Sequence, residues 1–379
     1  YQFADPKRSF INDLSFLSDR SIWAASRKGF SVLRGEQWQY VVSPSSAKSN
    51  QDQQVHTIVR VGEQDLYFNY QEGVWRINGT SLQADSLGLA AFVGLGSSWD
   101  KQLIYLSSAV DSPYESINFK MKSYPETQAP LLLKSVLAQN IGRTRTRFRF
   151  LAIGPNESWA TTGEEVYHIQ GKELEVYGRS DGLPSDFVND LVQDKQGTIW
   201  VATEKGIASY TAKQSWQIFA PLDKIACRRL VFDPQGHLWI GTQQGLYRWD
   251  GLVLERFDSQ MGLVSNDINA LALDQEQRLW IGTSRGISSL DLKKMIDSGE
   301  APTLIMQSVI LDGQSIPVDS VPNIESSQNL TWQYAGLYYA NPQEIAYRYR
   351  FLAQEDWQYT LEDKISASQL NAGSYQLQI

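Results

Sequence analysis

The sequence of 379 residues contains one cysteine, Cys227, and three histidines, His56, His168 and His237. A single cysteine excludes an internal disulfide framework and any metal site built from several thiolates. No histidine has a second ligand at the short spacing that metal-binding motifs use, so the sequence predicts no metal site and no cofactor. A nucleophile elbow and a glycine-rich phosphate loop are also missing, and we expect no catalytic residues and no enzymatic activity.

The chain also lacks a long hydrophobic run and an excess of positive charge. No stretch approaches the roughly 18 apolar residues that cross a bilayer. The start at Tyr1 fits both a removed signal peptide and a shortened chain. The net charge is -8, and nucleic acid is not expected as a partner because its binding depends on summed positive charge. Membrane attachment is expected only through segments outside this sequence.

Aromatic residues and glycine are abundant, with 12 Trp, 18 Tyr and 27 Gly. This composition favours short strands and tight turns over helices, so the fold class is expected to be all-β. Two domains are expected if one of them is a large all-β unit.

One pattern recurs along the first three quarters of the chain. Its clearest copies, which combine Ile or Leu, Trp, small residues and a final Gly, are residues 22–29, 199–206, 238–245 and 279–286. Including weaker copies, the seven marker residues are Trp23, Tyr67, Tyr105, Trp159, Trp200, Trp239 and Trp280, at intervals of 38–54 residues. A repeat of about 40–45 residues with four short strands predicts a β-propeller, here with seven blades.

The two ends of the repeat region predict how the ring closes. No fourth strand follows residues 287–290 of the last unit, whereas residues 1–4 resemble residues 216–220, a fourth strand elsewhere. We expect residues 1–4 to complete the last blade, because closure removes exposed sheet edges. The longest interval, after Tyr105, predicts a functional or mobile insertion at about residues 111–140.

The repeats resemble the two-component-regulator propeller repeat, whose units carry a Gly-Leu-Pro-Ser lead, an Asp-x-x-Gly turn and an Ile-Trp-Ile-Gly-Thr strand. The leads stand at residues 181–185 and 261–265. The aromatic alternation in residues 346–351 and the Gly-Ser-Tyr at 373–375 resemble the Y_Y_Y domain, a β-sandwich that follows such propellers. This resemblance implies a seven-bladed β-propeller over residues 1–298. A small Ig-like or Y_Y_Y-like β-sandwich, truncated at its C-terminus, would follow over residues 303–379.

The same resemblance implies the sensory domain of a membrane-bound bacterial signalling receptor. It would lie in the periplasm as the ectodomain of an inner-membrane protein, detect a ligand and transmit the signal through the C-terminal sandwich. The output would be of the histidine kinase, hybrid two-component or diguanylate cyclase type, and the full-length receptor would be a homodimer. Two alternatives remain open because fold alone does not decide function: a secreted propeller enzyme acting on polysaccharide, and a protein-binding scaffold.

Polar residues recur at one repeat position, near the start of the innermost strand of each blade. Counting back 11 residues from each marker gives Asn12, His56, Gly94, Asn189, Arg228 and Asn269, with Arg149 counted as equivalent after a deletion. Polar groups at the axis are costly unless they meet water, one another or a ligand. A water-filled structural channel is the alternative to a ligand site.

Arginines add a second signal on this acidic chain. Those expected to form a basic patch are Arg27, Arg145, Arg147, Arg228, Arg229 and Arg285. Guanidinium groups suit carboxylates, sulfates and phosphates, although pairing with Asp or Glu is the alternative. The sequence thus predicts a polar or anionic small molecule or oligosaccharide as partner. The candidate ligand-binding residues are Arg149, Arg228, Asn189, Asn269, Asn12, Arg27 and Arg285.

Overall fold

The computed structural model describes only part of the chain. The described residues are 1, 9–35, 37–41, 55–61, 63, 65–70, 73–78, 84–90, 92–97, 103–109, 118–124, 131–134, 148–161, 163–171, 173–210, 215–251, 253–295, 303–318, 328–337, 347–351, 357–360, 362–368 and 374–379. The chain divides into two compact units. The first comprises Tyr1–Ile218, Leu222–Tyr247 and Arg256–Met295, and the second comprises Phe219–Pro221, Arg248–Glu255 and Ile296–Ile379.

Short antiparallel strands dominate residues 11–291. The first four sheets consist of β1 (Ile11–Phe16), β2 (Ile22–Ser26), β3 (Gly29–Arg34), β4 (Gln37–Val41), β5 (Val55–Val61), β6 (Asp65–Tyr70), β7 (Gly73–Asn78), β8 (Ala84–Ala90), β9 (Phe92–Ser97), β10 (Leu103–Ala109), β11 (Asn118–Tyr124), β12 (Leu131–Lys134), β13 (Arg149–Gly154), β14 (Glu157–Thr161), β15 (Val166–Gln170) and β16 (Glu173–Tyr177). The next sheets consist of β17 (Val188–Gln193), β18 (Ile199–Thr203), β19 (Gly206–Tyr210), β20 (Trp216–Ile218), β21 (Cys227–Phe232), β22 (Leu238–Thr242), β23 (Leu246–Trp249), β24 (Leu254–Phe257), β25 (Ile268–Leu273), β26 (Arg278–Thr283) and β27 (Gly286–Asp291). Short 3-10 turns are η2 (Arg179–Asp181), η3 (Ala220–Leu222), η4 (Ser259–Met261) and η5 (Leu292–Lys294).

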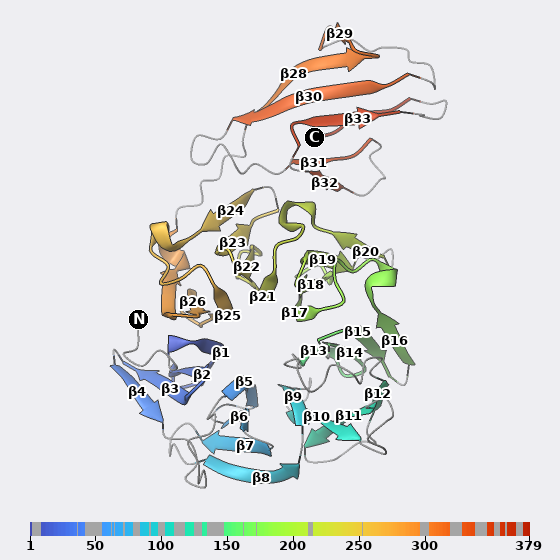
Figure 1. Ribbon diagram of the computed structural model, residues 1–379. Coiled ribbons are helices and arrows are strands. Elements are labelled where there is room, and N and C mark those ends of the chain that lie inside the picture. The colour runs from blue at the N-terminus through green and yellow to red at the C-terminus, as the bar shows by residue number, and fades with distance from the viewer. Residues whose placement is uncertain are drawn as a thin grey trace. The chain divides into compact units, whose positions relative to one another are not determined.

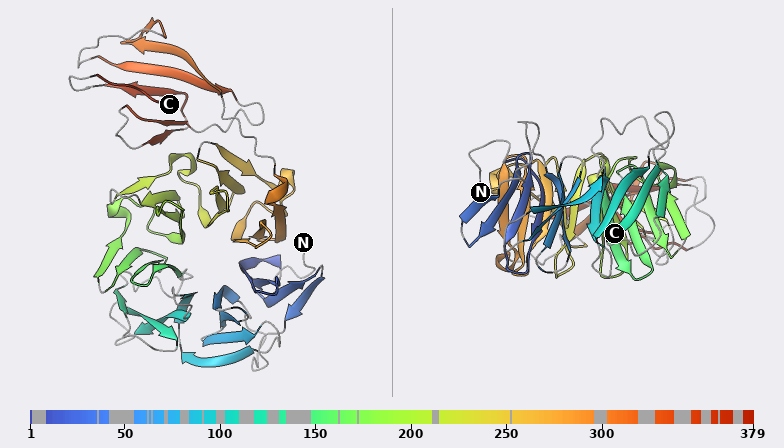
Figure 2. Two further views of the ribbon diagram at one scale, coloured as in Figure 1. Left: turned by 180° about the vertical axis from the view of Figure 1, so that it is seen from behind. Right: turned by 90° about the horizontal axis from the view of Figure 1, so that it is seen from below.

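These strands form a ring of sheets. Each sheet takes its strands in chain order, four at a time, except that the described residues of the last sheet give only β25-β26-β27. The first strand of each sheet contacts the first strand of the next, from β1 to β5 and onward to β25, and β25 contacts β1 again. Figure 1 shows this ring, and Figure 2 shows it from behind and from below. The fold of the repeat region is therefore a β-propeller, and the all-β prediction is confirmed.

The repeat sequence builds one turn several times. Asp233 accepts the N–H groups of Gly236 and His237 at 2.9 Å each, and its second oxygen accepts the Trp239 indole N–H at 2.9 Å. Asp194 and Asp274 accept the indole N–H of Trp200 and Trp280 in the same way, at 3.1 and 2.9 Å. The aspartate thus connects the turn between the first two strands to the tryptophan of the second strand. The Asp-x-x-Gly motif is therefore a hairpin turn.

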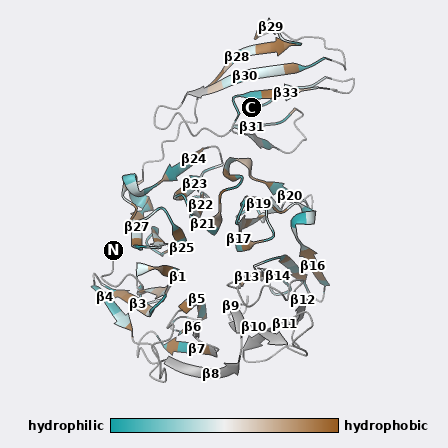
Figure 3. Cartoon of the chain, in the orientation of Figure 1, coloured by the Kyte–Doolittle hydropathy of each residue, from teal (hydrophilic) through white to brown (hydrophobic). Residues whose placement is uncertain are grey.

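Neighbouring sheets pack closely through small residues. An added Cβ at Gly282 of β26 would lie 2.6 Å from Cγ2 of Ile11, and one at Gly241 of β22 would lie 2.8 Å from Cγ2 of Ile268. Trp23 and Trp239 are buried in apolar clusters and therefore pack the sheets together. Figure 3 shows both hydrophobic and hydrophilic colour along the strands of the ring.

The ring closes through Tyr1, with a register that differs from the expected one. The Tyr1 carbonyl accepts a hydrogen bond from the Ile287 N–H at 2.8 Å, and the N-terminal amino group of Tyr1 donates to the Ile287 carbonyl at 2.5 Å. Ile287 follows Gly286 as Ile207 follows Gly206, and the pairing of Ala208 with Ile218 places residue 219 at the level of Tyr1. The sequence match aligns Tyr1 with Trp216, three residues earlier, because it compares letters without strand register. Residues 2–4 lie outside the described residues.

The stretch 111–140 is not wholly an insertion. It contains β11 and β12, which pair with each other and complete the third sheet beside β10. The remainder of that stretch lies outside the described residues.

The second unit contains two further sheets. The larger has the order β29-β28-β30-β33, from β28 (Thr303–Leu311), β29 (Gln314–Ile316), β30 (Leu330–Leu337) and β33 (Lys364–Ala367). The smaller pairs β31 (Tyr347–Tyr349) with β32 (Gln358–Thr360). Tyr334 of β30 is fully buried and its ring lies 4.7 Å from that of Tyr347, which packs the two sheets together.

Candidate functional site

The polar repeat position coincides with a bulge in the innermost strands. The strand register shifts between Ile11 and Asp13, Val188 and Asp190, Cys227 and Arg229, and Ile268 and Ala270. The strand register skips one residue at each shift, and these residues are Asn12, Asn189, Arg228 and Asn269. A bulge redirects a side chain and interrupts strand pairing, so these four residues are able to reach the neighbouring sheet.

Two of these asparagines fasten adjacent sheets together. The Asn12 amide donates to the Val55 carbonyl at 2.7 Å, and the Asn189 amide donates to the Cys227 carbonyl at 2.7 Å. The aspartate that follows each asparagine continues the connection, because Asp13 accepts the Ile58 N–H at 3.2 Å and Asp190 accepts the Leu230 N–H at 2.9 Å. Each Asn-Asp pair therefore links the innermost strand of its own sheet to the innermost strand of the next sheet through side-chain hydrogen bonds.

Arg149 occupies a different repeat position from the one expected. It pairs with Thr161, two residues after Trp159, and β13 has no bulge at this point. Asp13, Asp190 and Arg229 pair with residues two after Trp23, Trp200 and Trp239, respectively. Arg149 is thus equivalent to these three residues and not to Arg228. The sequence count misses this because a bulge adds one residue to the other strands.

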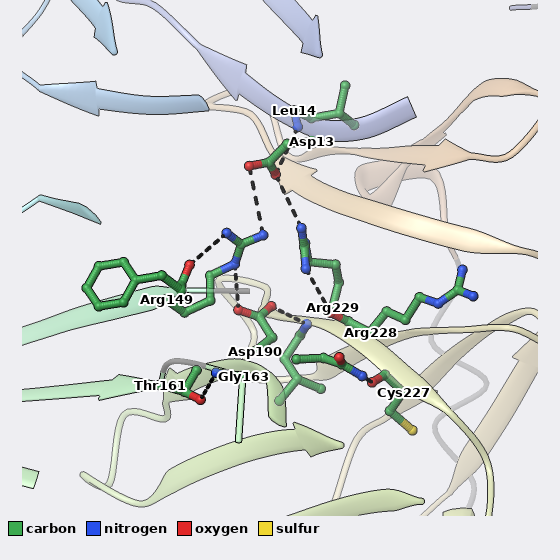
Figure 4. A network of polar contacts seen from close by, with 12 residues as sticks. Asp13, Leu14, Arg149, Thr161, Gly163, Asp190, Cys227, Arg228 and Arg229 are labelled. Carbon is green, nitrogen blue, oxygen red and sulfur yellow. Dashed lines mark hydrogen bonds and ion pairs between the residues drawn. The ribbon is translucent and has the colours of Figure 1, made fainter. Parts of the chain in front are cut away.

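These four equivalent residues form one charge network near the axis (Figure 4). The Arg149 guanidinium lies between two carboxylates, with Nε 3.5 Å from Asp190 and Nη2 3.9 Å from Asp13. Nη2 of Arg229 lies 3.8 Å from Asp13. Two arginines and two aspartates balance in charge, so the network has no net charge of its own.

The network is buried, and burial governs its electrostatics. The side chains of Asp13, Asp190, Arg149 and Arg229 are 9–16% exposed. Burial raises the pKa of Asp190, although Arg229 and Arg149 act in the opposite direction. The ion-pair distances exceed the roughly 2.7–2.9 Å of a charge-assisted hydrogen bond. The guanidinium groups also donate to backbone carbonyls, Arg149 to Phe148 at 3.2 Å and Arg229 to Arg228 at 3.0 Å, and the carboxylates accept backbone N–H groups.

Arg228 and Asn269 form a second polar pair, one bulge position apart around the ring. Nη1 of Arg228 donates to Asn269 at 2.5 Å and to Asp267 at 2.6 Å. Nε of Arg228 and Nδ2 of Asn269 are buried and have no hydrogen-bond partner among the described residues. Buried donors without partners are costly, so this pair is a place where a ligand acceptor would be stabilised.

The remaining candidates do not join these groups. The guanidinium of Arg27 lies 3.7 Å from the ring centroid of Phe10, and Arg285 is exposed on the turn after β26. Arg145 and Arg147 lie outside the described residues. The sequence interpretation misses Asp13 and Asp190, although the repeated Asn-Asp dipeptide at two bulge positions is a usable signal.

Within the described ranges, no three His, Cys, Asp or Glu side chains are grouped so that they could hold a metal ion. In the same part of the chain, no helix has the length and apolar character needed to cross a membrane.

Comparisons with known proteins agree with the repeat. Residues 182–205 and 262–285 match the family model of the two-component regulator propeller. No curated protein sequence matches the chain. Two segments of this chain are therefore similar to the two-component regulator propeller repeat.

Solved structures support the propeller fold. The streptogramin B lyase structure covers 76% of this chain and 95% of its own, at 12% identity and a TM-score of 0.56. PorZ, a surface component of the type-IX secretion system of Porphyromonas gingivalis, covers 99% of this chain at 14% identity and a TM-score of 0.52, and this chain spans 57% of its length. An extracellular domain described as part of a one-component system from B. thetaiotaomicron covers 97% of this chain and 66% of its own, at 15% identity and a TM-score of 0.43. At these identities the likeness to the lyase and to PorZ concerns the fold alone.

Proposed function

We propose that this chain is the extracytoplasmic sensory module of a bacterial signalling receptor. The observation that carries the proposal is the match of residues 182–205 and 262–285 to the two-component regulator propeller. Both segments run from the lead before an innermost strand to the turn after the tryptophan strand, and both build the same turn around Asp194 or Asp274. A receptor of the histidine kinase, hybrid two-component or diguanylate cyclase type would supply the output.

The proposed architecture is a seven-bladed propeller over residues 1–298 followed by a Y_Y_Y-like sandwich over residues 303–379. Seven sheets follow one another over the described residues from 11 to 291, and Tyr1 adds to the last of them. The contact of Tyr334 with Tyr347 between the two sheets of the second unit supports a small sandwich. In a periplasmic homodimeric receptor, this sandwich would pass the signal toward the membrane.

The ligand is proposed to be a small polar or anionic molecule, such as an acidic sugar or an organic acid, bound at the axis. The ion pairs of Arg149 and Arg229 are 3.5–3.9 Å long, and each guanidinium also donates to a backbone carbonyl, so a ligand carboxylate at hydrogen-bond distance would add a shorter charged contact. Nε of Arg228 and Nδ2 of Asn269 are donors that such a ligand would satisfy. A network rearranged by the ligand would act on Asp13 and Asp190, which connect adjacent sheets.

Calorimetric screening of acidic monosaccharides, oligosaccharides and organic acids tests this proposal. Arg228→Ala and Arg149→Lys should each weaken binding about tenfold or more, because a charged hydrogen bond contributes roughly 1.5–3 kcal/mol. Lys195→Ala is the control, since this exposed cation lies on a turn between the first two strands of its sheet. A ligand indifferent to both axial substitutions would contradict the site.

The two alternatives are separable by other assays. A secreted enzyme would degrade polysaccharides, and products would appear with the purified chain alone. A scaffold would capture a protein partner in pull-down or light-scattering experiments without any small ligand. Either result, together with no binding in calorimetry, would replace the sensor proposal.

A further inference from the structure

A cavity of about 900 Å³ lies between the last and the first sheet of the ring. Its lining includes the turn residues Asp19 and Arg20 after β1 and the turn residues Asp274 and Glu276 after β25. These turns follow the ends of the inner strands, whereas Asn12 and Asn269 lie at their starts. The cavity is thus at the opposite end of the strands from the bulges. None of the four network residues lines it.

One wall of the cavity is aromatic. The Tyr1 ring stacks on Trp280 with centroids 6.0 Å apart and an interplanar angle of 17°. Phe16, Ile22 and Leu33 add apolar surface from the first sheet. Figure 1 shows β1–β4 next to β25 and β26, with the N-terminus beside them. A flat apolar ring is the kind of group that such a wall accommodates.

The cavity also has a surplus of positive charge. Its lining contains the four arginines Arg20, Arg34, Arg60 and Arg278 and the three acids Asp19, Asp274 and Glu276.

All three acids already have partners. Asp19 accepts the Ser21 N–H and hydroxyl at 2.9 and 2.5 Å. Asp274 holds its own turn and the Trp280 indole. Glu276 pairs with Arg20 at 2.8 Å.

Arg278 is the cation best placed to meet a ligand. Its guanidinium lies 5.9 Å from the Trp280 ring centroid. Within the described residues no carboxylate or carbonyl accepts a hydrogen bond from this guanidinium, and its side chain is partly buried. A partly buried guanidinium beside an aromatic wall favours an anionic group attached to a ring.

We propose that this cavity is a binding site for a small organic anion that carries a planar apolar ring, such as an aromatic carboxylate. The ring lies along the wall formed by Tyr1 and Trp280, and Arg278 pairs with the anionic group. This site is independent of the axial site and of the signalling role proposed above.

Fluorescence titration with anilinonaphthalene sulfonate, a ring-bearing anion, tests the proposal, with displacement by benzoate as the second measurement. Benzoate should displace the probe. Acetate, which has the charge without the ring, and benzamide, which has the ring without the charge, should not displace it at the same concentration.

Three substitutions are expected to have three different effects on the affinity for the probe. Arg278→Gln should weaken binding of the probe about tenfold. Glu276→Gln should tighten it about threefold, because it releases Arg20 from its carboxylate partner. Arg285→Gln, on the exposed turn that follows the other end of β26, is the matched control and should leave binding unchanged. Circular dichroism and the unfolding midpoint report whether each variant is folded.

Equal displacement by benzoate and benzamide would overturn the proposal, because the site would then not recognise charge. Equal probe affinity in wild type and Arg278→Gln would also overturn it, as would an equal loss in Arg285→Gln. Displacement by benzoate alone, with opposite shifts in Arg278→Gln and Glu276→Gln, supports it.

Discussion

Gly282→Ala should destabilise the protein by forcing the last sheet away from the first. The new Cβ would lie 2.6 Å from Cγ2 of Ile11, 3.0 Å from Cβ of Ala270 and 3.1 Å from Cβ of Ile11. Ile11 is fully buried, so it cannot move into solvent. Overpacking of this kind costs about 1–3 kcal/mol, and the backbone contribution of a strand glycine offsets only part of it.

Chemical denaturation measures this cost as a change in the free energy of unfolding. Gly154→Ala is the matched control, because no atom lies within 4 Å of the position that its Cβ would take and its φ is not positive. That variant should be neutral or stabilised by up to about 1 kcal/mol.

A double-mutant cycle ties the effect to ring closure. Ile11→Ala removes Cγ2 and should cost about 2–5 kcal/mol as a cavity. Combined with Gly282→Ala, the total loss should fall short of the sum by at least about 1 kcal/mol, because the closest contact, the one with Cγ2 of Ile11, is gone. If the two changes are additive, or if Gly282→Ala behaves like Gly154→Ala, the close packing of the last sheet on the first is refuted.

Four further outcomes are expected. Trp239→Ala, at a buried position, should lose about 3–5 kcal/mol in denaturant unfolding, whereas the partly exposed Trp200→Ala should lose less; equal losses would contradict this ranking. Gly241→Ala should lose about 1–3 kcal/mol through contact with Ile268, and a neutral result would argue against tight packing at that junction. Cys227 is buried and burial raises its pKa, so maleimide should label it only after unfolding; rapid labelling of the native protein would show an open inner strand. Burial raises the pKa of the Asp190 carboxyl above its usual 3.8, so this group stays protonated to a higher pH in the folded state than in the unfolded state. The contribution of Asp190 to the free energy of unfolding should therefore fall as pH rises from about 4 through the raised pKa. Asp190→Asn should remove that slope, and an unchanged pH profile would contradict it.

The fold was predictable because its signals are local and repeated. The Asp-to-Trp spacing that fixes the turns at Asp194, Asp233 and Asp274 is visible as letters, and several copies in phase indicate a ring of similar sheets. The position of Tyr1 was less predictable, since two alignments that differ by three residues look alike until strand register is known. The sequence predicts an insertion at 111–140 because β11 and β12 lack the repeat letters.

The site was only partly predictable, for a physical reason. Counting residues back from a marker identifies Asn12, Asn189, Arg228 and Asn269, which share the bulge position. The same count misplaces Arg149, because a bulge changes the number of residues between two equivalent points. Arg149 forms ion pairs with Asp13 and Asp190, which belong to sheets far apart in the sequence. No local sequence pattern indicates which of these charged residues pair.

The side chains at the bulge position and at the position after it have different partners in different sheets, and these partners indicate how ligand binding could change the structure. In two sheets the Asn-Asp pair hydrogen-bonds the backbone of the next innermost strand, so Asp13 and Asp190 each contact a neighbouring sheet directly. In two other sheets the equivalent position carries Arg149 or Arg229, which form ion pairs with those aspartates. A ligand that attracted either arginine would leave a buried carboxylate with fewer positive neighbours. Because burial already raises the pKa of Asp190, losing Arg149 would favour its protonation further. Ligand binding at the axis would thus be coupled to proton uptake, and calorimetry in buffers of different ionisation enthalpy would reveal it.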